Sequence, residues 1–569
     1  METIDNASKT VHLPIFGSAA VSGDIDVEAE LAAFEAEERK RLGLEDGKEH
    51  WRDVPAPAFT ASQRPHTTIL VCGLTMAHDM FVEGALTGLG YKVKCMDVPD
   101  NNALRFGKEF GNRGQCNPTY FTVGNLVKYL SYLRDEQGMS TPDIIANYLF
   151  LTAGACGPCR FGMYATEYRK ALRDAGFDGF RVILFQQQGG LKQATGEKEG
   201  LEMKPAFFIA LLKALLTGDV LNALMYRLRP YEVVPGSVDE AVARSKKVVH
   251  AALTEGRSII PALLQVRRIM AAIEIDRTVI KPKVSIIGEF WAMTTEGDGN
   301  YKLQRFLEQE GAECDVQLVA AWILFMVWEN VYDTKERMYL RGTDTGRKSL
   351  KAPADAARKL AKLWVADKAV RGIFHSFAYL LGLEGYHLAN MDEVADEAQK
   401  YYNLNVRGGE AHMEVGKLVL TVKHKKANMV LSVKPFGCMP SSGVSDGVQS
   451  IVTEKHPDAI FLPIETNGDG AVNVYSRIQM MLFKARQHAK DEVQRVLDEV
   501  GMSLEDARAL QQKLPWLRRT LHHTPHSHKA ASSAANFVYE AAGWKKRLDR
   551  VMAAPRSIGS RVAQLAASF

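Results

Sequence analysis

Short apolar runs rich in β-branched residues recur along the chain, and segments of helical length and periodicity separate them. Four runs lie in the first half, at 67–73, 91–98, 146–154 and 180–186, and four in the second, at 283–290, 312–317, 427–437 and 458–465. Strands that alternate with helices predict βαβ units and therefore parallel sheets. We expect an α/β fold with two parallel-sheet domains of similar layout.

The segments outside these runs predict helical extensions and a helical connector. An apolar stretch at 206–228 is interrupted by Lys213, Asp219 and Arg227, which is typical of a buried helix. The predicted organisation is an N-terminal helical or extended segment (1–65), a first α/β domain (66–200), a helical connector (201–282), a second α/β domain with a helical insertion (283–490) and a helical C-terminal extension (491–569).

Composition and charge narrow the class of protein. The 569 residues include 71 basic and 67 acidic side chains, a balance that does not favour a nucleic-acid partner. The longest strongly apolar run, 318–328, is far shorter than the roughly 20 residues of a membrane span. No apolar signal core is visible near the N-terminus. An odd number of cysteines, seven, spread widely, favours a reducing compartment. We therefore expect a cytoplasmic protein that does not cross a membrane.

Four of the cysteines fall where predicted strands end or predicted helices begin. Cys156 and Cys159 form a CxxC pair after the third strand of the first half, and Cys438 follows the third strand of the second half. Cys116 directly precedes a predicted helix. In an open parallel sheet, ligands bind beyond the carboxyl ends of the strands. Glycines and prolines around these cysteines let the backbone approach a bulky ligand, and helix N-termini stabilise thiolates.

The spacing of these cysteines leaves several kinds of chemistry open. A CxxC pair alone is also typical of a thioredoxin-type redox site, but that interpretation leaves Cys116 and Cys438 without a role. Zinc accepts four thiolates, yet structural zinc sites usually consist of two close pairs. One close pair plus two distant single cysteines fits an iron–sulfur cluster held by separate loops better. Cys72, Cys95 and Cys314 are expected to be small buried hydrophobes.

The sequences around the four cysteines resemble the 2-hydroxyacyl-CoA dehydratase superfamily, in particular the component fused to or associated with acyl-CoA dehydratase activases. The likeness lies in GQCNPTYFTVGNLVKYL, TAGACGPCRFGMYATEYRKAL and VKPFGCMPSS, and it extends to 283–313 and 460–482. It covers about 66–490 and leaves out the flanking helical regions. The sequence contains neither an actin-like phosphate loop nor GxxxxGK[ST], so ATP has to be handled by a separate protein.

The resemblance implies two flavodoxin-like domains with a cluster between them, [4Fe–4S] or, in some relatives, a double-cubane. Cys116, Cys159 and Cys438 match the family's motif cysteines best, and Cys156 matches a more variable position. Two cubanes would require further ligands, for which Cys72 and Cys95 are the candidates. The implied partner is an ATP-hydrolysing activator protein with its own cluster. The electron then passes to the thioester carbonyl of an acyl-CoA substrate. Relatives dimerise, so a homodimer is expected.

Polar residues near the strand ends are candidates for catalysis and substrate binding. Glu289 and Glu465 each lie at the end of a predicted strand, where a carboxyl group can act as an acid or base or can cap the next helix. Arg160 follows the CxxC pair and can offset cluster charge, hold a phosphate of acyl-CoA or form a surface ion pair. Asn473 and Arg477 lie one helical turn apart and can share one polar contact.

Two short motifs and two other functional interpretations complete the sequence-based expectations. Gly-Asp-Gly occurs at 297–299 and 468–470 and predicts turns. Four histidines in LHHTPHSHK (521–529) predict a solvated polar loop rather than a metal site. The sequence is also compatible with a non-catalytic electron relay or scaffold that binds an activator, and with a zinc-stabilised α/β protein.

Overall fold

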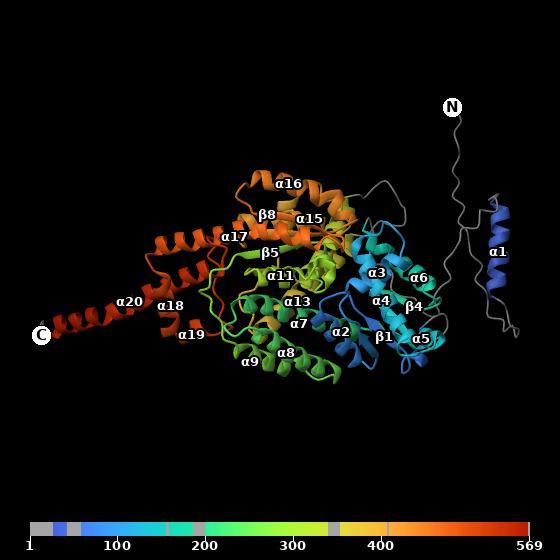
Figure 1. Cartoon of the computed structure of the whole chain (residues 1–569), viewed down its shortest axis with the longest axis horizontal. Coiled ribbons are helices and arrows are strands. Elements are labelled where there is room, and N and C mark those ends of the chain that lie inside the picture. The colour runs from blue at the N-terminus through green and yellow to red at the C-terminus, as the bar shows by residue number, and fades with distance from the viewer. Residues whose placement is uncertain are drawn as a thin grey trace, which may run out of the picture. The chain divides into compact units, whose positions relative to one another are not determined.

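A computed structural model describes residues 27–42, 59–154, 159–185, 200–339, 353–406 and 409–566. The chain divides into two units, Met1–Pro55 and Ala56–Phe569. The first unit contains the helix α1 (Val27–Arg41), which its charged helical sequence predicted. Every other element that the structure describes belongs to the second unit (Figure 1).

The first half of the second unit is built on a four-stranded parallel sheet with the strand order β2-β1-β3-β4. Its strands are β1 (Thr68–Val71), β2 (Lys92–Cys95), β3 (Tyr148–Ala153) and β4 (Arg181–Phe185). Its helices are α2 (Met76–Thr87), α3 (Asn101–Phe110), α4 (Asn117–Asp135), α5 (Thr141–Asn147) and α6 (Tyr164–Asp174).

The second half repeats this topology with the order β6-β5-β7-β8, again parallel throughout. Its strands are β5 (Lys283–Gly288), β6 (Glu313–Val316), β7 (Met429–Pro435) and β8 (Phe461–Thr466). Its helices are α10 (Phe290–Thr294), α11 (Leu303–Gln309), α12 (Val319–Tyr339), α13 (Pro353–Leu381), α14 (Met391–Ala398), α15 (Ala411–Lys423) and α16 (Asp446–Lys455). In each sheet the first strand lies between the second and the third, so the strand order changes direction between the first and third strands. Ligands bind at such switch points in open α/β sheets.

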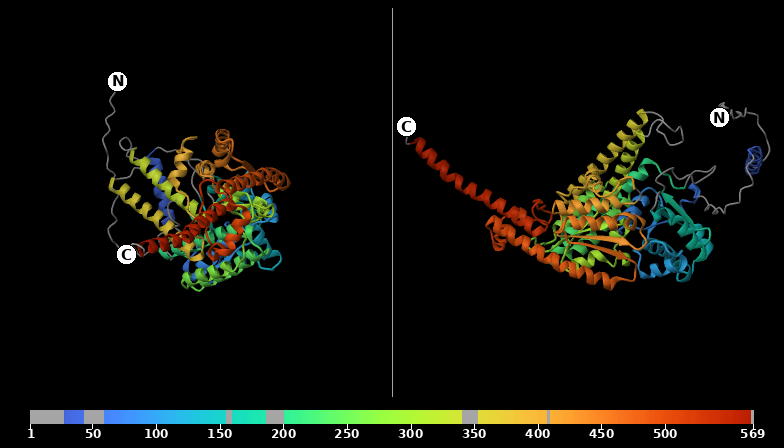
Figure 2. Two further views of the ribbon diagram at one scale, coloured as in Figure 1. Left: turned by 90° about the vertical axis from the view of Figure 1, so that its left-hand side faces the viewer. Right: turned by 90° about the horizontal axis from the view of Figure 1, so that it is seen from above.

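Further helices connect the two sheets and continue the chain beyond the second one. The connecting helices are α7 (Pro205–Leu228), α8 (Ser237–Thr254) and α9 (Ile259–Ala271). The C-terminal helices are α17 (Ala471–Val500), α18 (Leu504–Lys513), α19 (Pro515–Arg518) and α20 (Ser533–Ala566). α17 packs against β8 and α20, and α20 leads away from the sheets (Figures 1 and 2).

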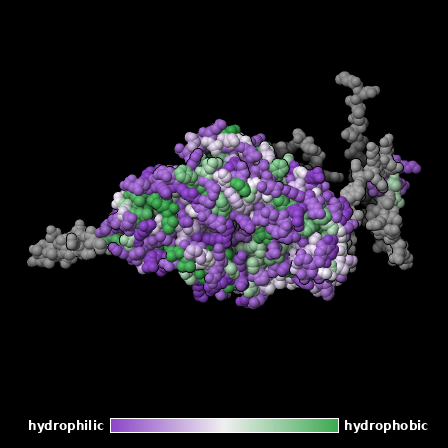
Figure 3. All heavy atoms as spheres, viewed as in Figure 1, coloured by the Kyte–Doolittle hydropathy of each residue, from purple (hydrophilic) through white to green (hydrophobic). Residues whose placement is uncertain are grey.

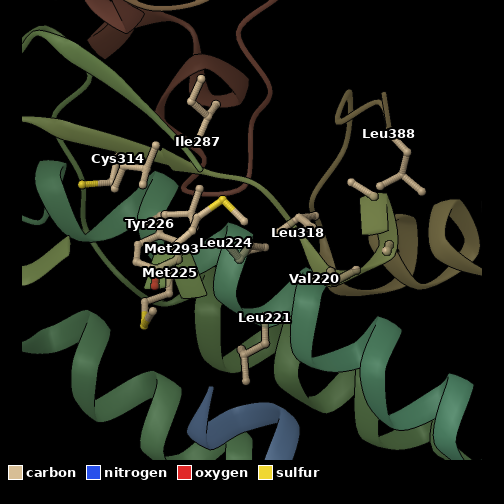
Figure 4. Close-up of a cluster of buried hydrophobic side chains, with 14 of the residues drawn as sticks. Val220, Leu221, Leu224, Met225, Tyr226, Ile287, Met293, Cys314, Leu318 and Leu388 are labelled. Atoms are coloured by element: carbon tan, nitrogen blue, oxygen red, sulfur yellow. The ribbon is translucent and has the colours of Figure 1, made fainter. Parts of the chain in front are cut away.

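Apolar side chains pack on both faces of the first sheet, which is why its inner strands β1 and β3 read as nearly continuous apolar runs. Leu70 and Phe150 pack with α4 and α6 on one face. Ile69 and Leu149 pack with α2 and α7 on the other face. The second sheet shares one large core with α7, α12 and α13, and Figure 4 shows the part of it around α7. α7 therefore joins the two halves through a buried apolar surface.

The structure confirms all eight strands predicted from the apolar runs, and it confirms the buried helix predicted at 206–228. The segment between the second predicted strand and Cys116, for which the apolar pattern predicts a loop, instead contains the helix α3. Asp100 caps α3 by accepting a hydrogen bond from the Ala103 amide (2.8 Å). The apolar residues of this helix do follow helical spacing, but it has only ten residues, and Asn101, Asn102 and Gly107 are poor helix formers that weaken the local signal.

In the part of the chain that the structure describes, one helix is long and apolar enough to cross a membrane by length and composition. It spans Pro205–Tyr231, and 61% of its most apolar window is buried inside the protein. It contacts α2 and α13, as a core helix of a globular unit does. The face shown in Figure 3 is mainly hydrophilic, with apolar side chains scattered over it, which is ordinary for a protein surface.

Candidate metal centre

Cys116 and Cys438 lie on loops of different halves, and these loops touch through their backbones. Cys116 is the N-cap of α4, and the amide of the next residue, Asn117, donates to the Phe436 carbonyl at 2.9 Å. Gly437 has a φ of +75°, and a Cβ there would lie 3.2 Å from the Cys116 Cα. Glycine is therefore needed at this position both for its conformation and for the close approach. Both thiols are buried.

Cys159 lies on a third loop, after β3, which is joined to the Cys116 loop by two contacts. The Arg160 guanidinium donates to the Gly114 carbonyl. Tyr164, at the start of α6, places its hydroxyl 3.1 Å from the Cys116 Sγ. The cysteine loops that follow β3 and β7, the equivalent third strands of the two sheets, both contact the loop that opens α4.

The number and spacing of thiols bear on which metal group fits. Cys156, the other half of the CxxC pair, lies outside the described residues. Among the residues that the structure describes, no three His, Cys, Asp or Glu side chains form a group that could hold one metal ion. The ligands of an iron–sulfur cluster stand further apart, because irons and sulfides lie between them.

Two carboxyl groups from the second half, one half-buried (Glu289) and one buried (Glu410), lie close to the thiols. Glu289 follows β5 and caps α10 by accepting a hydrogen bond from the Ala292 amide (2.8 Å). Glu410 precedes α15 and accepts a hydrogen bond from the Phe290 amide (2.6 Å). Burial raises the pKa of both carboxyl groups, and for Glu410 the neighbouring Glu289 raises it further. Glu289 therefore performs the capping role expected of it and also faces the cysteine loops.

The electrostatic environment keeps the free thiols protonated. Burial raises the pKa of the Cys116, Cys159 and Cys438 thiols, that of Cys159 to about 12. Glu289 and Glu410 add to the shift for the last two. Cysteines that act as nucleophiles or redox catalysts have lowered pKa values and partial exposure. These three do not match that description, whereas a metal deprotonates the thiols that it binds.

Glu410 and Glu414 are the site residues that sequence reasoning misses. They lie one helical turn apart at the start of α15, directly before β7. Glu414 accepts hydrogen bonds from the Ser441 hydroxyl (3.2 Å) and the Ser445 hydroxyl, and burial raises its pKa to about 7. The signal available in the sequence was a pair of glutamates at i, i+4 spacing that opens an otherwise largely apolar stretch before a predicted strand.

Three of the predicted site residues, Glu465, Asn473 and Arg477, form no hydrogen bond with a cysteine loop among the described residues. Glu465 is exposed in β8, the edge strand of the second sheet. Asn473 and Arg477 lie on α17, where Asn473 is exposed and Arg477 donates to the Pro463 carbonyl at 2.8 Å.

The remaining cysteines lie in or beside strands; Cys314 is buried as expected, whereas Cys72 and Cys95 are half-buried and have the carboxyl groups of Asp79 and Glu83 as neighbours. Cys72 follows β1 and Cys95 ends β2, so that they lie at the ends of neighbouring strands. Burial raises the pKa of both thiols, that of Cys95 to about 12, and the two thiols interact electrostatically with each other. Cys314 is buried in β6 and donates to the Gln304 carbonyl at 3.6 Å.

The two Gly-Asp-Gly turns hold α3 between the halves of the molecule. Asp298 accepts a hydrogen bond from the Asn101 amide (3.0 Å), and Asp469 forms an ion pair with Lys108 (2.9 Å). Gly468 has a φ of +89°, and a Cβ there would lie 2.2 Å from the end of the Leu104 side chain of α3, so glycine suits this close approach. The two turns therefore hold α3, and with it the following Cys116 loop, against the second half of the molecule.

A cavity of about 440 Å³ lies beside the contact between Asn117 and Phe436. The cations Lys108 and Arg113 line it together with Asn117, and Asp469 lies on the same wall. The Asn117 side chain is buried, and its Nδ2 has no hydrogen-bond partner among the described residues. Because an unsatisfied buried donor is costly, this atom is available to a bound group. Because Lys108 is paired with Asp469, Arg113 is the lining cation that carries the excess positive charge, which suits an anionic group.

Comparisons with known proteins do not assign a function to this site. No protein-family model matches the chain, and no curated protein matches it. What the site can do is therefore argued from its own residues.

Proposed function

We propose that the chain is an iron–sulfur protein of the 2-hydroxyacyl-CoA dehydratase type. The observation that carries this proposal is the meeting of three cysteine loops, around Cys116, Cys159 and Cys438, at the carboxyl ends of two parallel sheets. The strand order 2-1-3-4 in both sheets supports the finer assignment of flavodoxin-like domains. The four-cysteine ligand set is completed by Cys156.

The donor set fits a cluster better than a single ion. The thiols come from three separate loops, glycine and proline flank them, and no described trio of side chains can hold a lone ion. A [4Fe–4S] cluster is the simplest group for four cysteines, and a double-cubane would draw in Cys72 and Cys95 as well. When bound, the cluster supplies one-electron transfer at low potential.

The surrounding residues would shift the reduction potential of a bound cluster in opposite directions. The hydroxyls of Thr119 and Tyr164 lie 3.0 and 3.1 Å from the Cys116 Sγ, and hydrogen bonds to sulfur ligands raise a reduction potential. The carboxyl groups of Glu289 and Glu410 act in the other direction whenever they are ionised, because negative charge opposes reduction. Burial favours their neutral forms, so each can hold a proton on a carboxyl oxygen for a departing hydroxyl group.

The cavity beside Asn117 suits the anionic part of an acyl-CoA or a similar substrate. Arg113 supplies positive charge there beside the Lys108–Asp469 ion pair, and the Asn117 Nδ2 supplies a free donor. Arg160 is tied to the Gly114 carbonyl and holds the third cysteine loop in place. The electron source would be an ATP-hydrolysing activator protein with its own cluster. We place the protein in the cytoplasm as a homodimer, in line with the family that the sequence resembles.

Anaerobic purification followed by iron and sulfide analysis tests the cluster. We expect a brown protein with about four irons and four sulfides per chain, or about twice that for a double-cubane. A protein that stays colourless after anaerobic reconstitution contradicts the proposal. Zinc without sulfide would instead identify a zinc-stabilised α/β protein.

A turnover assay separates the enzyme from an electron relay. The iron-loaded protein is mixed with an activator, ATP, a reductant and a panel of acyl-CoA thioesters. ATP consumption that is coupled to substrate conversion supports an enzyme. Cluster reduction without conversion of any thioester supports a non-catalytic relay or scaffold, the second interpretation of the same site.

A further inference from the structure

A second and larger cavity, of about 570 Å³, lies beside β5 and β6. Segments that are far apart in the sequence build its walls: the end of α7, one face of α15, the loop before α14 and the histidine-rich loop 521–529. Its volume falls within the range of about 300–1,000 Å³ that is typical of small-molecule sites. No part of the proposed metal centre lines it.

The charged side chains that line this cavity are mostly cationic. Glu313 and Asp315 are the acidic side chains in the wall. Five basic side chains face them, which are Arg227, Arg277, Lys283, Lys417 and Lys426. Four histidines add further polar groups, which are His387, His523, His526 and His528. An excess of buried or half-buried positive charge is unfavourable unless an anion offsets it.

Internal partners neutralise only part of this charge. Glu313 is satisfied by Lys283 (3.3 Å), by the Tyr231 hydroxyl (2.8 Å) and by the Ser533 hydroxyl (2.6 Å). Arg227 and Arg277 both donate to the same main-chain carbonyl, that of His522, at 3.0 Å. Among the described residues neither guanidinium hydrogen-bonds to a carboxylate. Both positive charges in the cavity wall are therefore offset only by main-chain carbonyls and one histidine nitrogen among these partners.

Lys417 is the clearest unpartnered group in the wall. It forms neither a hydrogen bond nor an ion pair with any residue that the structure describes. Burial lowers the pKa of its ammonium group to about 8, although the charge of Asp315 partly offsets this. The Thr524 hydroxyl in the same wall is buried and also has no hydrogen-bond partner among the described residues. The cavity therefore contains two hydrogen-bond donors, Lys417 and Thr524, that have no acceptor among the described residues.

The histidine-rich loop belongs to this cationic environment. Burial lowers the pKa of His523 to about 4, and the positive charge of Arg227 lowers it further. Burial also lowers the pKa of His526. No trio of His, Cys, Asp or Glu in the described ranges can hold a metal ion, which argues against a metal role for this loop.

Apolar side chains also line the cavity. They include Tyr226, Cys314, Leu318 and Leu388, which belong to the hydrophobic cluster around α7 (Figure 4). A ligand that fills the cavity would therefore contact apolar side chains as well as positive charge. We propose that this cavity binds a small organic anion, in which phosphate or carboxylate groups contact Lys417, Arg227 and Thr524 and an apolar part packs against these apolar side chains.

Thermal unfolding of the full chain tests the proposal with defined probes. Pyrophosphate, citrate and phenyl phosphate are each compared with sodium chloride at equal ionic strength. A ligand that binds only the folded state raises the melting temperature in a concentration-dependent way. We expect such a rise with phenyl phosphate and with at least one of the other two. Whether pyrophosphate or citrate acts identifies phosphate or carboxylate as the recognised group.

Lys417→Met is the decisive variant, because it keeps the apolar stem and removes the unpartnered ammonium group. Without ligand it should melt at the same temperature as the wild type or higher, since an unpaired buried charge is lost. Its apparent affinity for the probes should fall about tenfold, as expected for one charge-assisted hydrogen bond. Lys484→Met, an exposed position on α17, is the matched control and should bind like the wild type. Thr524→Val gives a second test that sacrifices no existing hydrogen bond.

Three results would overturn the proposal. The first is a melting temperature that responds to the probes only as it responds to sodium chloride. The second is an equal response in wild type, Lys417→Met and Thr524→Val. The third is stabilisation by Zn²⁺ alone, which would make the histidine-rich loop a metal site. None of these results bears on the cluster, whose iron content is measured separately.

Discussion

The Asn117 amide donates to the Phe436 carbonyl over 2.9 Å, and this bond ties together two loops that are more than three hundred residues apart. Each loop carries a cysteine next to the bond, Cys116 on one side and Cys438 on the other. The two thiols are therefore positioned by the same contact between the halves of the molecule. A change that separates the loops should act on both thiols at once.

Gly437→Ala tests this contact directly. The glycine has a φ of +75°, and an alanine Cβ would lie 3.2 Å from both the Cys116 Cα and the Gln115 carbonyl oxygen. We expect a loss of about 1–3 kcal/mol in the free energy of unfolding and a lower iron content after reconstitution. Gly443→Ala is the control, because nothing lies within 4 Å of the position that its added methyl group would take. Equal stability and iron content in the two variants would show that the loops do not depend on this approach.

Alanine substitution of the cysteines tests which thiols are ligands. Cys116→Ala, Cys159→Ala and Cys438→Ala should each reduce retention of iron by at least about tenfold, because loss of a ligand leaves one iron open to exchange. Cys314→Ala is the matched control, a buried cysteine in β6 that lines the other cavity. Iron-to-protein ratios and visible spectra under anaerobic conditions measure the effect. Equal iron loss in Cys314→Ala would contradict the assignment of Cys116, Cys159 and Cys438 as the cluster ligands.

Much of the fold could be predicted because buried parallel strands leave a strong local signal. β7, for example, is buried along its whole length and appears in the sequence as a plain apolar run. The helix α3 leaves a weaker signal, because it has only ten residues and contains the poor helix formers Asn101, Asn102 and Gly107, and its position depends on contacts with the two Gly-Asp-Gly turns. Its omission from the sequence-based prediction follows from that.

The candidate site could be predicted in part for a similar reason. Cys159 and Cys438 were found because each follows a strand, and strand ends are visible in the sequence. Glu410 was missed because its role depends on a hydrogen bond from the Phe290 amide, which lies 120 residues away in the sequence. No local sequence pattern indicates such a long-range contact. The large cationic cavity was missed because its wall is assembled from α7, α15 and the histidine-rich loop.

Asp219→Ala tests a buried polar contact that holds α7 to the second half. Asp219 accepts hydrogen bonds from the Val319 amide (2.9 Å) and the Ala320 amide (2.6 Å), and it lies 3.2 Å from the His78 Nε2. Its loss leaves two amides and an imidazole unsatisfied in the core, so we expect the free energy of unfolding to fall by about 3 kcal/mol or more. Urea denaturation measures this loss. Asp178→Ala, at an exposed loop position, should change stability by less than about 0.5 kcal/mol.

The carboxyl groups beside the thiols predict how stability depends on pH in metal-free protein. Burial raises the pKa of Glu414 from 4.5 to about 7, so the folded state keeps a proton that the unfolded chain releases between these values. The free energy of unfolding should therefore fall as pH rises through this window, by up to about 1.4 kcal/mol per pH unit for one such group. The raised pKa values of Glu289 and Glu410 act in the same direction.

Glu414→Gln separates this effect from other titrations, because the amide keeps the size of the side chain but cannot ionise. Urea denaturation at several pH values from about 5 to about 8 should give a shallower fall in stability for the variant than for the wild type. Glu454→Gln, at an exposed position on α16, should follow the wild type throughout. A slope that stays unchanged in Glu414→Gln would mean that this carboxyl group is already ionised in the folded protein. It would then add negative charge beside the thiols, which favours a lower cluster potential.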